Sequence, residues 1–223
     1  MKFGGSNHRG KKMGKGKGLI GQKLGMTSLF TTAGEQIPVT VISAGPCVVT
    51  QIKTTATDGY KSIQLAYGDI KEKNVNKPMK GHFEKSGGKS FLMLKEFIVE
   101  DTEQYKLGQA IKAEDVFNIG EKIKITGRTK GRGFSGVIKR HGFHGGKKTH
   151  GSMSHRIPGS IGCSATPSRV IKGKKLPGQY GNTNNTVKNI EIIDIRPDNN
   201  IILIKGAIPG CNKGILSLYK QSV

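Results

Sequence analysis

Four histidines and one cysteine lie close together in the sequence, in a pattern that invites a test for metal binding. They are His141, His144, His150, His155 and Cys163. Zinc ligands usually come in tight pairs on a turn or a helix, and a carboxylate often orients a metal-bound histidine. His141 and His144 form one weak pair, and no Asp or Glu occurs between residues 122 and 190. The spacing therefore predicts no metal and no cofactor, and histidines among Arg, Lys and Gly more often donate to phosphates or stack on bases.

Two glycine-rich motifs have the spacing of nucleotide-binding loops. Residues 131–136 read GRGFSG and follow a strand-like run. A dinucleotide site also needs a following helix and an acid about 20 residues later, but the next acid is Glu191. Residues 5–12 have P-loop spacing without the Ser or Thr that would bind magnesium. The glycines of 131–136 instead favour a close approach of the backbone to phosphate, with Lys130 and Arg132 supplying the charge.

Catalytic groups are not apparent in either part of the chain. The histidines lie where acids are absent, so no triad of nucleophile, histidine and acid is predicted. The acids of residues 35–121 alternate with lysines, as solvated surface charge does. The sequence therefore predicts a protein that is not an enzyme and has no small-molecule substrate.

The net charge of the chain is strongly positive and unevenly distributed. Lys and Arg number 37 against 15 Asp and Glu, which gives a formal net charge of +22. Like charges repel in a compact state, so this excess indicates a polyanionic partner. Residues 1–34 carry +7, residues 35–121 carry −1, residues 122–190 carry +15 and residues 191–223 carry +1. A nearly neutral body is therefore expected to carry two basic segments.

Nucleic acid is the polyanion that fits these basic segments, and a membrane is not. No apolar run approaches the roughly 18 residues that span a bilayer, and the basic stretches lack the wide apolar face of an interfacial helix. The three cysteines, Cys47, Cys163 and Cys211, are far apart and odd in number, which suits unbridged thiols in a reducing compartment. The first 18 residues have no apolar segment of a secretory signal, so a cytoplasmic location is expected.

The body is predicted to be mainly β, as a small barrel. Short apolar and β-branched runs are separated by turn residues such as Gly45-Pro46 and Asp58-Gly59. The predicted strands are 36–44, 47–55, 61–66, 91–99, 121–126, 187–195, 200–205 and 215–219. A short helix is predicted near residues 78–85, and residues 114–117 look like one helical turn.

Residues 127–186 differ from the body. Gly recurs about every five residues, apolar periodicity is absent and the charge has one sign, so this stretch cannot bury a core of its own. We expect an extension ordered against a partner, because a structureless loop of this length inside a compact domain is uncommon. The predicted organisation is a basic N-terminal arm (1–18), one β-barrel domain closed by 19–126 and 187–223, and the extension (127–186).

Candidate RNA-binding residues are the cations and histidines of the arm and the extension. They are Lys11, Lys12, Arg128, Lys130, Arg132, Lys139, Arg140, His141, His144, Lys147, Lys148, His150, His155, Arg156, Arg169, Lys172, Lys174 and Lys175. The aromatic residues Phe134, Phe143 and Tyr180 are candidates for stacking on bases, although Phe134 with Val137 and Ile138 would equally well form a local apolar anchor.

The extension is expected to reverse direction once, near its midpoint at residues 156–157, where Pro158-Gly159 favours a turn. The predicted tip is built from small or apolar residues that suit packing among bases. These are Ser152, Met153, Pro158, Gly159, Cys163, Ser164 and Ala165.

The charge pattern fits a structural protein of the ribosome and a DNA-architectural protein equally well, whereas an RNA-modifying enzyme would need a cofactor pocket or an acid–base pair.

An ordered set of segments separates these alternatives by resemblance. The segments are LIGQKLGMT (19–27), TKGRGFSGVIKR (129–140), THGSMSHRIPGSIG (149–162), TPSR (166–169), KGKKLPGQYGN (172–182) and LIKGAIPG (203–210). Together they resemble the bacterial-type ribosomal protein L-three family from residue 19 to about residue 219. No single segment is decisive, but their order is very specific.

The resemblance implies a β-barrel of the translation-protein type and an extension that reaches through rRNA toward the peptidyl-transferase centre, with the tip residues nearest to it. It also implies early binding to large-subunit rRNA, contacts with the proteins L-fourteen and L-nineteen, and a place in a cytoplasmic or organellar ribosome. Two departures stand out. Residues 1–18 precede the usual start of the family, and Cys163-Ser164-Ala165 offers no glutamine before Thr166-Pro167, so the methylation found in some relatives is expected to be absent.

Overall fold

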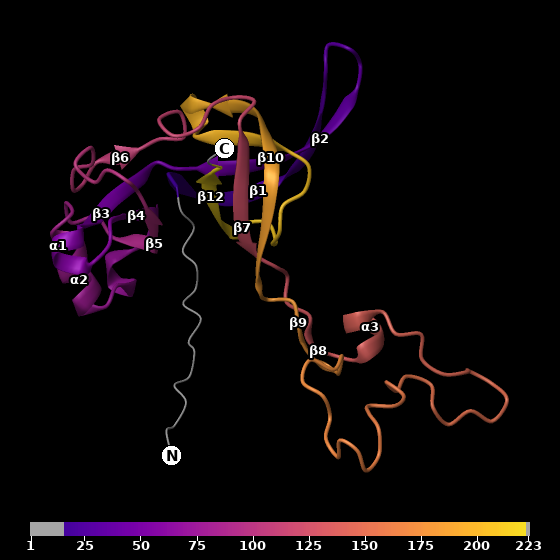
Figure 1. Ribbon diagram of the computed structural model, residues 1–223. Coiled ribbons are helices and arrows are strands. Elements are labelled where there is room, and N and C mark those ends of the chain that lie inside the picture. The colour runs from indigo at the N-terminus through magenta and orange to yellow at the C-terminus, as the bar shows by residue number, and fades with distance from the viewer. Residues whose placement is uncertain (1–15, 222–223) are drawn as a thin grey trace, which may run out of the picture. The chain divides into compact units, whose positions relative to one another are not determined.

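The computed structural model describes residues 16–221, and the chain divides into two units (Figure 1). Within the described residues, the barrel unit comprises residues 16–127 and 185–221, and the extension unit comprises Arg128–Asn184. Most of the predicted N-terminal arm, with the candidates Lys11 and Lys12, lies outside the described residues.

Six strands of the chain form a closed barrel, which confirms the predicted fold class. In their order around the barrel they are β1 (Gly18–Phe30), β12 (Ile215–Lys220), β7 (Lys122–Arg128), β10 (Asn184–Arg196), β11 (Ile201–Lys205) and β2 (Gln36–Ala44). In β7 the side chains alternate: Ile123 and Ile125 are buried, and Lys124 between them is half-buried. This period of two places the apolar residues inside the barrel.

A second sheet of four strands packs on the barrel, and its strands were expected inside the barrel itself. The order is β5 (Phe91–Ile98), β4 (Ser62–Asp69), β3 (Cys47–Lys53) and β6 (Ala110–Ile111). The prediction of one barrel from all the strands was therefore wrong for the runs 47–55, 61–66 and 91–99. The chain leaves the barrel at Gly45, whose φ of 83° suits glycine, and at Pro46, which cannot donate to a ladder.

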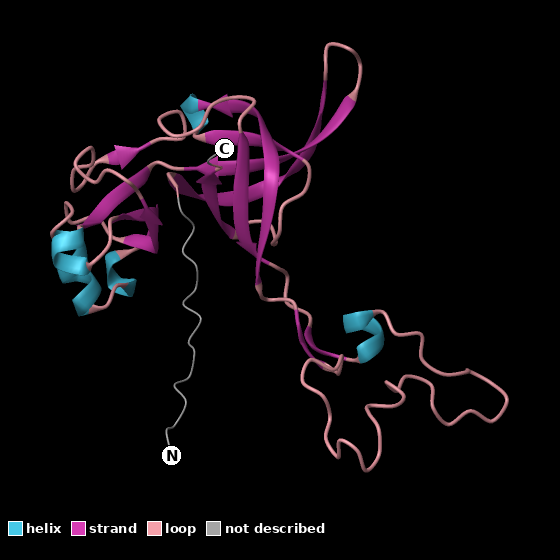
Figure 2. Cartoon of the chain, viewed as in Figure 1, coloured by secondary structure: helices cyan, strands magenta, loops and turns pink. Residues whose placement is uncertain are grey.

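Helical elements flank the second sheet. They are α1 (Thr55–Asp58), the 3₁₀ turn η1 (Glu72–Asn74) and α2 (Lys77–Glu84), and a further 3₁₀ turn η2 (Pro197–Asn199) joins β10 to β11 (Figure 2). The helix predicted near residues 78–85 is confirmed by α2. The single helical turn at residues 114–117 is also confirmed, because the Phe117 N–H donates to the Ala113 carbonyl oxygen at 3.0 Å. No helix in residues 16–221 is long and apolar enough to cross a membrane.

One apolar core joins the barrel to the second sheet. Leu19, Ile125 and Leu218 from the barrel lie in the same buried cluster as Leu65 and Phe97 from the sheet. The ring of Phe97 is fully buried and lies 5.3 Å from that of Tyr219, centroid to centroid. At Gly18 a Cβ atom would lie 2.7 Å from the Phe97 ring, so only glycine allows this close approach. Burial in this core also raises the pKa of the Cys47 thiol to about 12.

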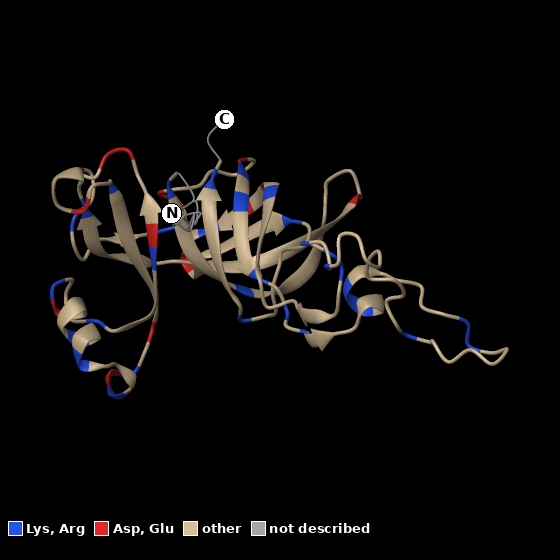
Figure 3. Cartoon of the chain, turned by 60° about the horizontal axis from the view of Figure 1, so that its bottom comes forward, with Lys and Arg blue, Asp and Glu red and all other residues tan. Residues whose placement is uncertain are grey.

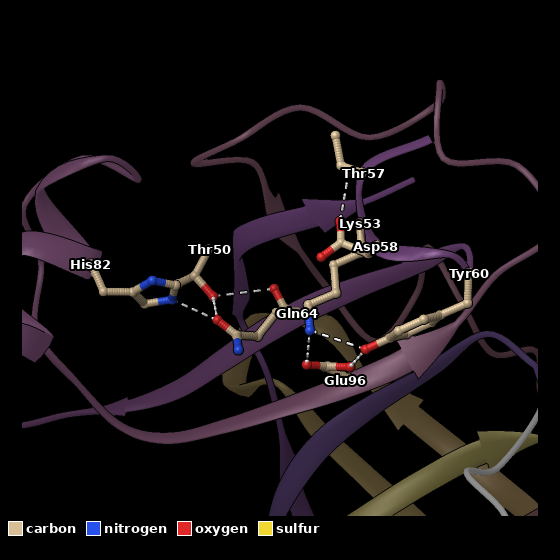
Figure 4. A network of polar contacts seen from close by, with 8 residues as sticks. All are labelled: Thr50, Lys53, Thr57, Asp58, Tyr60, Gln64, His82 and Glu96. Carbon is tan, nitrogen blue, oxygen red and sulfur yellow. Dashed lines mark hydrogen bonds and ion pairs between the residues drawn. The ribbon is translucent and has the colours of Figure 1, made fainter. Parts of the chain in front are cut away.

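A polar network ties the strands of the second sheet to each other and to α2 (Figure 4). The Lys53 ammonium lies 2.7 Å from the Glu96 carboxylate, and the Tyr60 hydroxyl donates to the other Glu96 oxygen at 2.8 Å. The hydrogen bond from Lys53 to Glu96 raises the pKa of the ammonium above its usual range. In the same view His82 Nε2 of α2 lies 2.7 Å from Gln64 Oε1 of β4. These bonds fix the face that α2 turns toward the sheet.

The shared core predicts a large loss of stability when Phe97 is truncated. Phe97→Ala is expected to lower the free energy of unfolding by about 3–5 kcal/mol, because it leaves a cavity between sheet and barrel. Phe30→Ala, at a ring that is 72% exposed, is expected to change it by no more than about 0.5 kcal/mol. Urea denaturation followed by circular dichroism measures both values. Equal losses in the two variants would contradict a core shared by sheet and barrel.

Candidate nucleic-acid interface

The extension unit has positive charge and no negative side chains. Residues 128–184 contain 12 Lys and Arg and four His, and they contain no Asp or Glu. No cation of the unit can therefore pair with a carboxylate of the same unit. The unit offers a set of donors whose natural complement is an anion from outside it.

Two short strands form the base of the extension unit. β8 (Gly133–Ser135) pairs with β9 (Gly178–Tyr180), and the Arg132 N–H donates to the Tyr180 carbonyl oxygen at 2.9 Å. Closer to the ends of the unit, the Thr129 N–H donates to the Thr183 carbonyl oxygen at 2.9 Å. These bonds hold the outgoing and returning limbs side by side. The two threonines carried no functional signal in the sequence, and only the structure identifies their role.

A helix of five residues, α3 (Val137–His141), follows β8 and was not predicted. Its residue Val137 is buried, and among residues 128–184 only Ser135 is buried as well. The helix follows the 131–136 glycine motif, but the acid that a dinucleotide site requires is still missing from the unit. Across the described residues, no group of three or more His, Cys, Asp or Glu is placed to hold a metal ion.

The aromatic side chains of the unit fall into different environments. Phe134 is 81% exposed, so the local apolar anchor is built on Val137 and not on Phe134. Phe143 is half-buried, with its ring 6.1 Å from that of His141. Tyr180 remains exposed on β9. Of the three stacking candidates, Phe134 presents the largest free aromatic surface.

Three of the predicted RNA-binding residues hold the backbone of the extension. Arg140 Nη1 donates to the Leu176 carbonyl oxygen at 2.6 Å, and His141 Nε2 lies 3.1 Å from the same oxygen. His155 Nδ1 lies 2.9 Å from the Lys147 carbonyl oxygen. Gly178 leaves room for the Arg140 guanidinium, because a Cβ atom there would lie 2.6 Å from Nη1. Arg140 and His141 thus join limbs that are 35 or more residues apart in the sequence, whereas His155 closes a local loop of the first limb.

The other predicted binding residues of the unit are exposed. Arg128 also makes a long hydrogen bond of 3.4 Å from Nε to the Asn182 carbonyl oxygen. The exposed set is Arg128, Lys130, Arg132, Lys139, His144, Lys147, Lys148, His150, Arg156, Arg169, Lys172, Lys174 and Lys175. The structure thus separates cations that organise the extension from cations that remain available to a partner.

The extension does not turn around once at residues 156–157, as the sequence predicted. A first reversal lies at residues 149–151, where the Gly146 N–H donates to the His155 carbonyl oxygen at 3.0 Å and His150 has a φ of 56°. A second lies at residues 165–168, where the Ser168 hydroxyl donates to the Ala165 carbonyl oxygen. Figure 1 shows two loops in this part of the chain. The predicted turn at the midpoint assumed a single hairpin, whereas the extension reverses direction at two places.

The predicted tip residues are divided between these two loops. Ser152 and Met153 follow the first reversal, and the Met153 side chain is 97% exposed. Cys163, Ser164 and Ala165 lead into the second reversal, and all three are exposed. Pro158 and Gly159 lie in the segment between the loops. Small and apolar side chains are therefore presented on both loops.

A β-barrel body that carries an acid-free basic extension is the arrangement expected of a structural protein with a polyanionic partner. Comparison with known proteins gives the family. Residues 95–199 match the family described as "Ribosomal protein L3". The chain is 52% identical to "Large ribosomal subunit protein uL3" of Desulforapulum autotrophicum over 92% of this chain and 98% of that protein. The protein of the same name from Desulfatibacillum aliphaticivorans is 60% identical over 92% of this chain and 96% of its own length.

The chain therefore belongs to the ribosomal protein L3 family, which confirms the resemblance seen in the sequence. A third relative, "Large ribosomal subunit protein uL3" of Desulfotalea psychrophila, is 47% identical over 94% of this chain and the whole of that protein. Members of this family are structural and non-enzymatic proteins of the large ribosomal subunit. Family membership thus decides against the DNA-architectural and RNA-modifying alternatives.

The two roles of the cations predict different effects of neighbouring substitutions. Arg140→Gln is expected to speed up amide hydrogen exchange in residues 132–142 and 176–182, because Leu176 loses its shortest donor and the two limbs separate more often. The same change at the exposed neighbour Lys139 is expected to leave exchange unchanged. Hydrogen exchange of the full chain, read by mass spectrometry on peptides, compares the two variants. Equal exchange in both would show that Arg140 does not organise the unit.

Proposed function

We propose that the chain binds large-subunit rRNA through residues 127–186, takes part in early assembly of the subunit and supports the peptidyl-transferase region through its extension. The observation that carries this proposal is the acid-free extension unit, whose 12 Lys and Arg are mostly exposed. RNA phosphates supply the negative charge that these residues lack within their own unit.

Burial in the extension unit supports a partner that completes its structure. Only Ser135 and Val137 are buried among residues 128–184, so the unit gains little from the hydrophobic effect. The entropy lost on ordering nearly 60 residues is far larger than such a small cluster offsets. Binding to RNA would supply the missing interactions, as it does for basic segments that fold on binding.

Two kinds of contact are available on the extension unit. Lys147 and Lys148 lie in the limb that leads to the first reversal, and Lys172, Lys174 and Lys175 lie on the returning limb. These cations suit phosphates, which fix the position of a protein on RNA without reading sequence. The small and apolar side chains on the two loops suit packing among bases. By family resemblance, these loops would be the part nearest to the peptidyl-transferase centre.

Phe134 offers a contact of a different kind. Its ring is 81% exposed, and Arg132, two residues earlier in the chain, is also exposed. An arginine beside an exposed ring can hold a phosphate while the ring stacks on a neighbouring unpaired base. Phe134 would thus add a contribution that salt does not screen.

Other partners of the chain are proposed from the family alone. Neighbouring proteins of the large subunit, L-fourteen and L-nineteen among them, would contact the chain in the ribosome. The resemblance to the family supports these contacts.

The electrostatic part of the proposal predicts a change in the salt dependence of RNA binding. Lys147→Gln with Lys148→Gln is expected to lower the slope of log affinity against log salt by about 1.4–1.8, since each phosphate contact contributes roughly 0.7–0.9. Lys106→Gln with Lys112→Gln removes the same charge from the barrel unit and serves as the control. Filter binding of the full chain to large-subunit rRNA across salt concentrations measures both slopes. Identical slopes in the two double variants would contradict a role for the extension cations.

The stacking part predicts a loss of affinity without a change of salt dependence. Phe134→Ala is expected to weaken rRNA binding by about 1–3 kcal/mol, because one base loses its platform, while the salt slope stays at the wild-type value. Phe134→Tyr keeps an aromatic face and should bind as the wild type does. Phe30→Ala removes an exposed ring from the barrel unit and controls for general loss of apolar surface. Wild-type affinity in Phe134→Ala would show that the ring contacts no base.

A further inference from the structure

The near neutrality of residues 35–121 is an average over two oppositely charged parts. Residues 71–89 contain six Lys and two Glu, whereas the rest of 35–121 contains five basic and ten acidic residues. A basic segment of net charge +4 is thus embedded in an acidic body. It corresponds to η1, α2 and the loop that leads to β5.

All six lysines of this segment are exposed and none is in an ion pair within residues 16–221. They are Lys71, Lys73, Lys77, Lys80, Lys85 and Lys89. The ion pairs of the barrel unit instead involve Lys53, Lys112, Lys220 and Arg196. Figure 3 shows Lys and Arg in blue along the helical part beside the second sheet. The charge of these lysines is therefore not neutralised by a carboxylate at ion-pair distance within the described residues.

The packing of α2 decides which of its residues face outward. Phe83 is buried and Met79 is partly buried against the cluster of Ala66 and Phe91, and His82 bonds to Gln64 of the sheet. Residues four apart on a helix lie one above the other. The row of Lys77, Gly81 and Lys85 therefore lies on the face that is turned away from the sheet.

Gly81 has no function inside the protein that the structure reveals. A Cβ atom added there would meet nothing within 4 Å, and the residue lies in the interior of an eight-residue helix, where glycine is unfavourable. Gly87 and Gly88, just beyond the helix, differ from Gly81, because their φ values of 111° and 77° themselves account for glycine there. Glycine at an exposed position between two lysines lets another molecule approach the helix backbone closely.

We propose that this α2 face, defined as Lys77, Lys80, Gly81, Lys85 and Lys89, is a second RNA-binding site that holds the phosphodiester backbone of large-subunit rRNA. The site lies in the barrel unit and goes beyond the proposed function, which assigns RNA binding to the extension. Lysines supply charge to the phosphates, and Gly81 removes the side chain that would hold the backbone away. An acidic protein is less favoured as the partner, because protein interfaces have an apolar core and this face presents only lysine, glycine and Glu84.

The first test uses the full chain and two matched triple variants. Lys77→Gln, Lys80→Gln and Lys85→Gln together should lower the salt slope of binding to large-subunit rRNA by about 2–3, or roughly 0.7–0.9 for each phosphate that is no longer neutralised. Lys61→Gln, Lys106→Gln and Lys112→Gln remove the same charge from exposed sites elsewhere in the barrel unit and should lower the slope by less than about 0.5.

The second test separates binding from folding at Gly81. Gly81→Ala should raise the thermal unfolding midpoint of the free protein, because alanine favours the helix, and should weaken rRNA binding at the same time. Opposite shifts of stability and affinity are not expected from a residue that only shapes the helix. Wild-type rRNA affinity in Gly81→Ala would show that no backbone approaches this position, which would overturn the close-approach part of the proposal.

The outcomes also distinguish this proposal from that for the extension. A slope lowered by the Lys147 and Lys148 substitutions but unchanged by the α2 triple variant would overturn the second site alone. An α2 triple variant that binds rRNA normally but fails to enter large subunits would do the same, and would assign this face to a protein neighbour. A wild-type chain without affinity for large-subunit rRNA would overturn both proposals.

Discussion

Positive charge without an internal counterpart is the constraint on which the rest of this structure depends. Ion pairs within the extension unit cannot stabilise it, because residues 128–184 contain no acid. An apolar core cannot stabilise it either, because Val137 is its only buried apolar side chain. What remains are backbone bonds between limbs, such as those at Thr129 and Arg132, and side-chain donors aimed at backbone oxygens. A segment built this way has a low stability of its own, and its exposed cations attract anions.

The barrel unit, in contrast, is stabilised by an apolar core of its own. It contributes the apolar core that the extension lacks, and that core includes residues from both the barrel and the second sheet. The chain leaves this unit at the end of β7 and re-enters it at the start of β10, and these strands are neighbours in the barrel. Both ends of the extension are therefore fixed by one folded body. Closing a long loop on a rigid base costs little more than closing a short one, so a basic insertion of this length is tolerated.

The sequence predicted those features that depend on local pattern, and failed where distant partners decide. Apolar and β-branched runs at residues 121–126 and 187–195 predicted β7 and β10, and the charge count identified the basic segment. Runs of the same kind predicted β3, β4 and β5, but such a run does not say whether a strand pairs within a barrel or in a separate sheet. That choice rests on contacts such as that of Phe97 with Tyr219, far apart in the sequence. Helix α3 was missed because five residues are too few to show a helical period.

For single residues of the candidate site, too, the sequence could not predict what distant partners decide. A count of cations treats Lys139 and Arg140 alike, yet one is exposed and the other donates to a carbonyl 36 residues away. This difference matters for binding, since affinity depends on the cost of ordering as well as on the contacts made. Arg140 and His141 hold the two limbs together and His155 holds the first loop, so all three reduce the freedom that a partner must remove. Such residues would favour RNA binding without contacting phosphate, so the loss of affinity on their substitution would come with a nearly unchanged salt slope, unlike that of the exposed lysines.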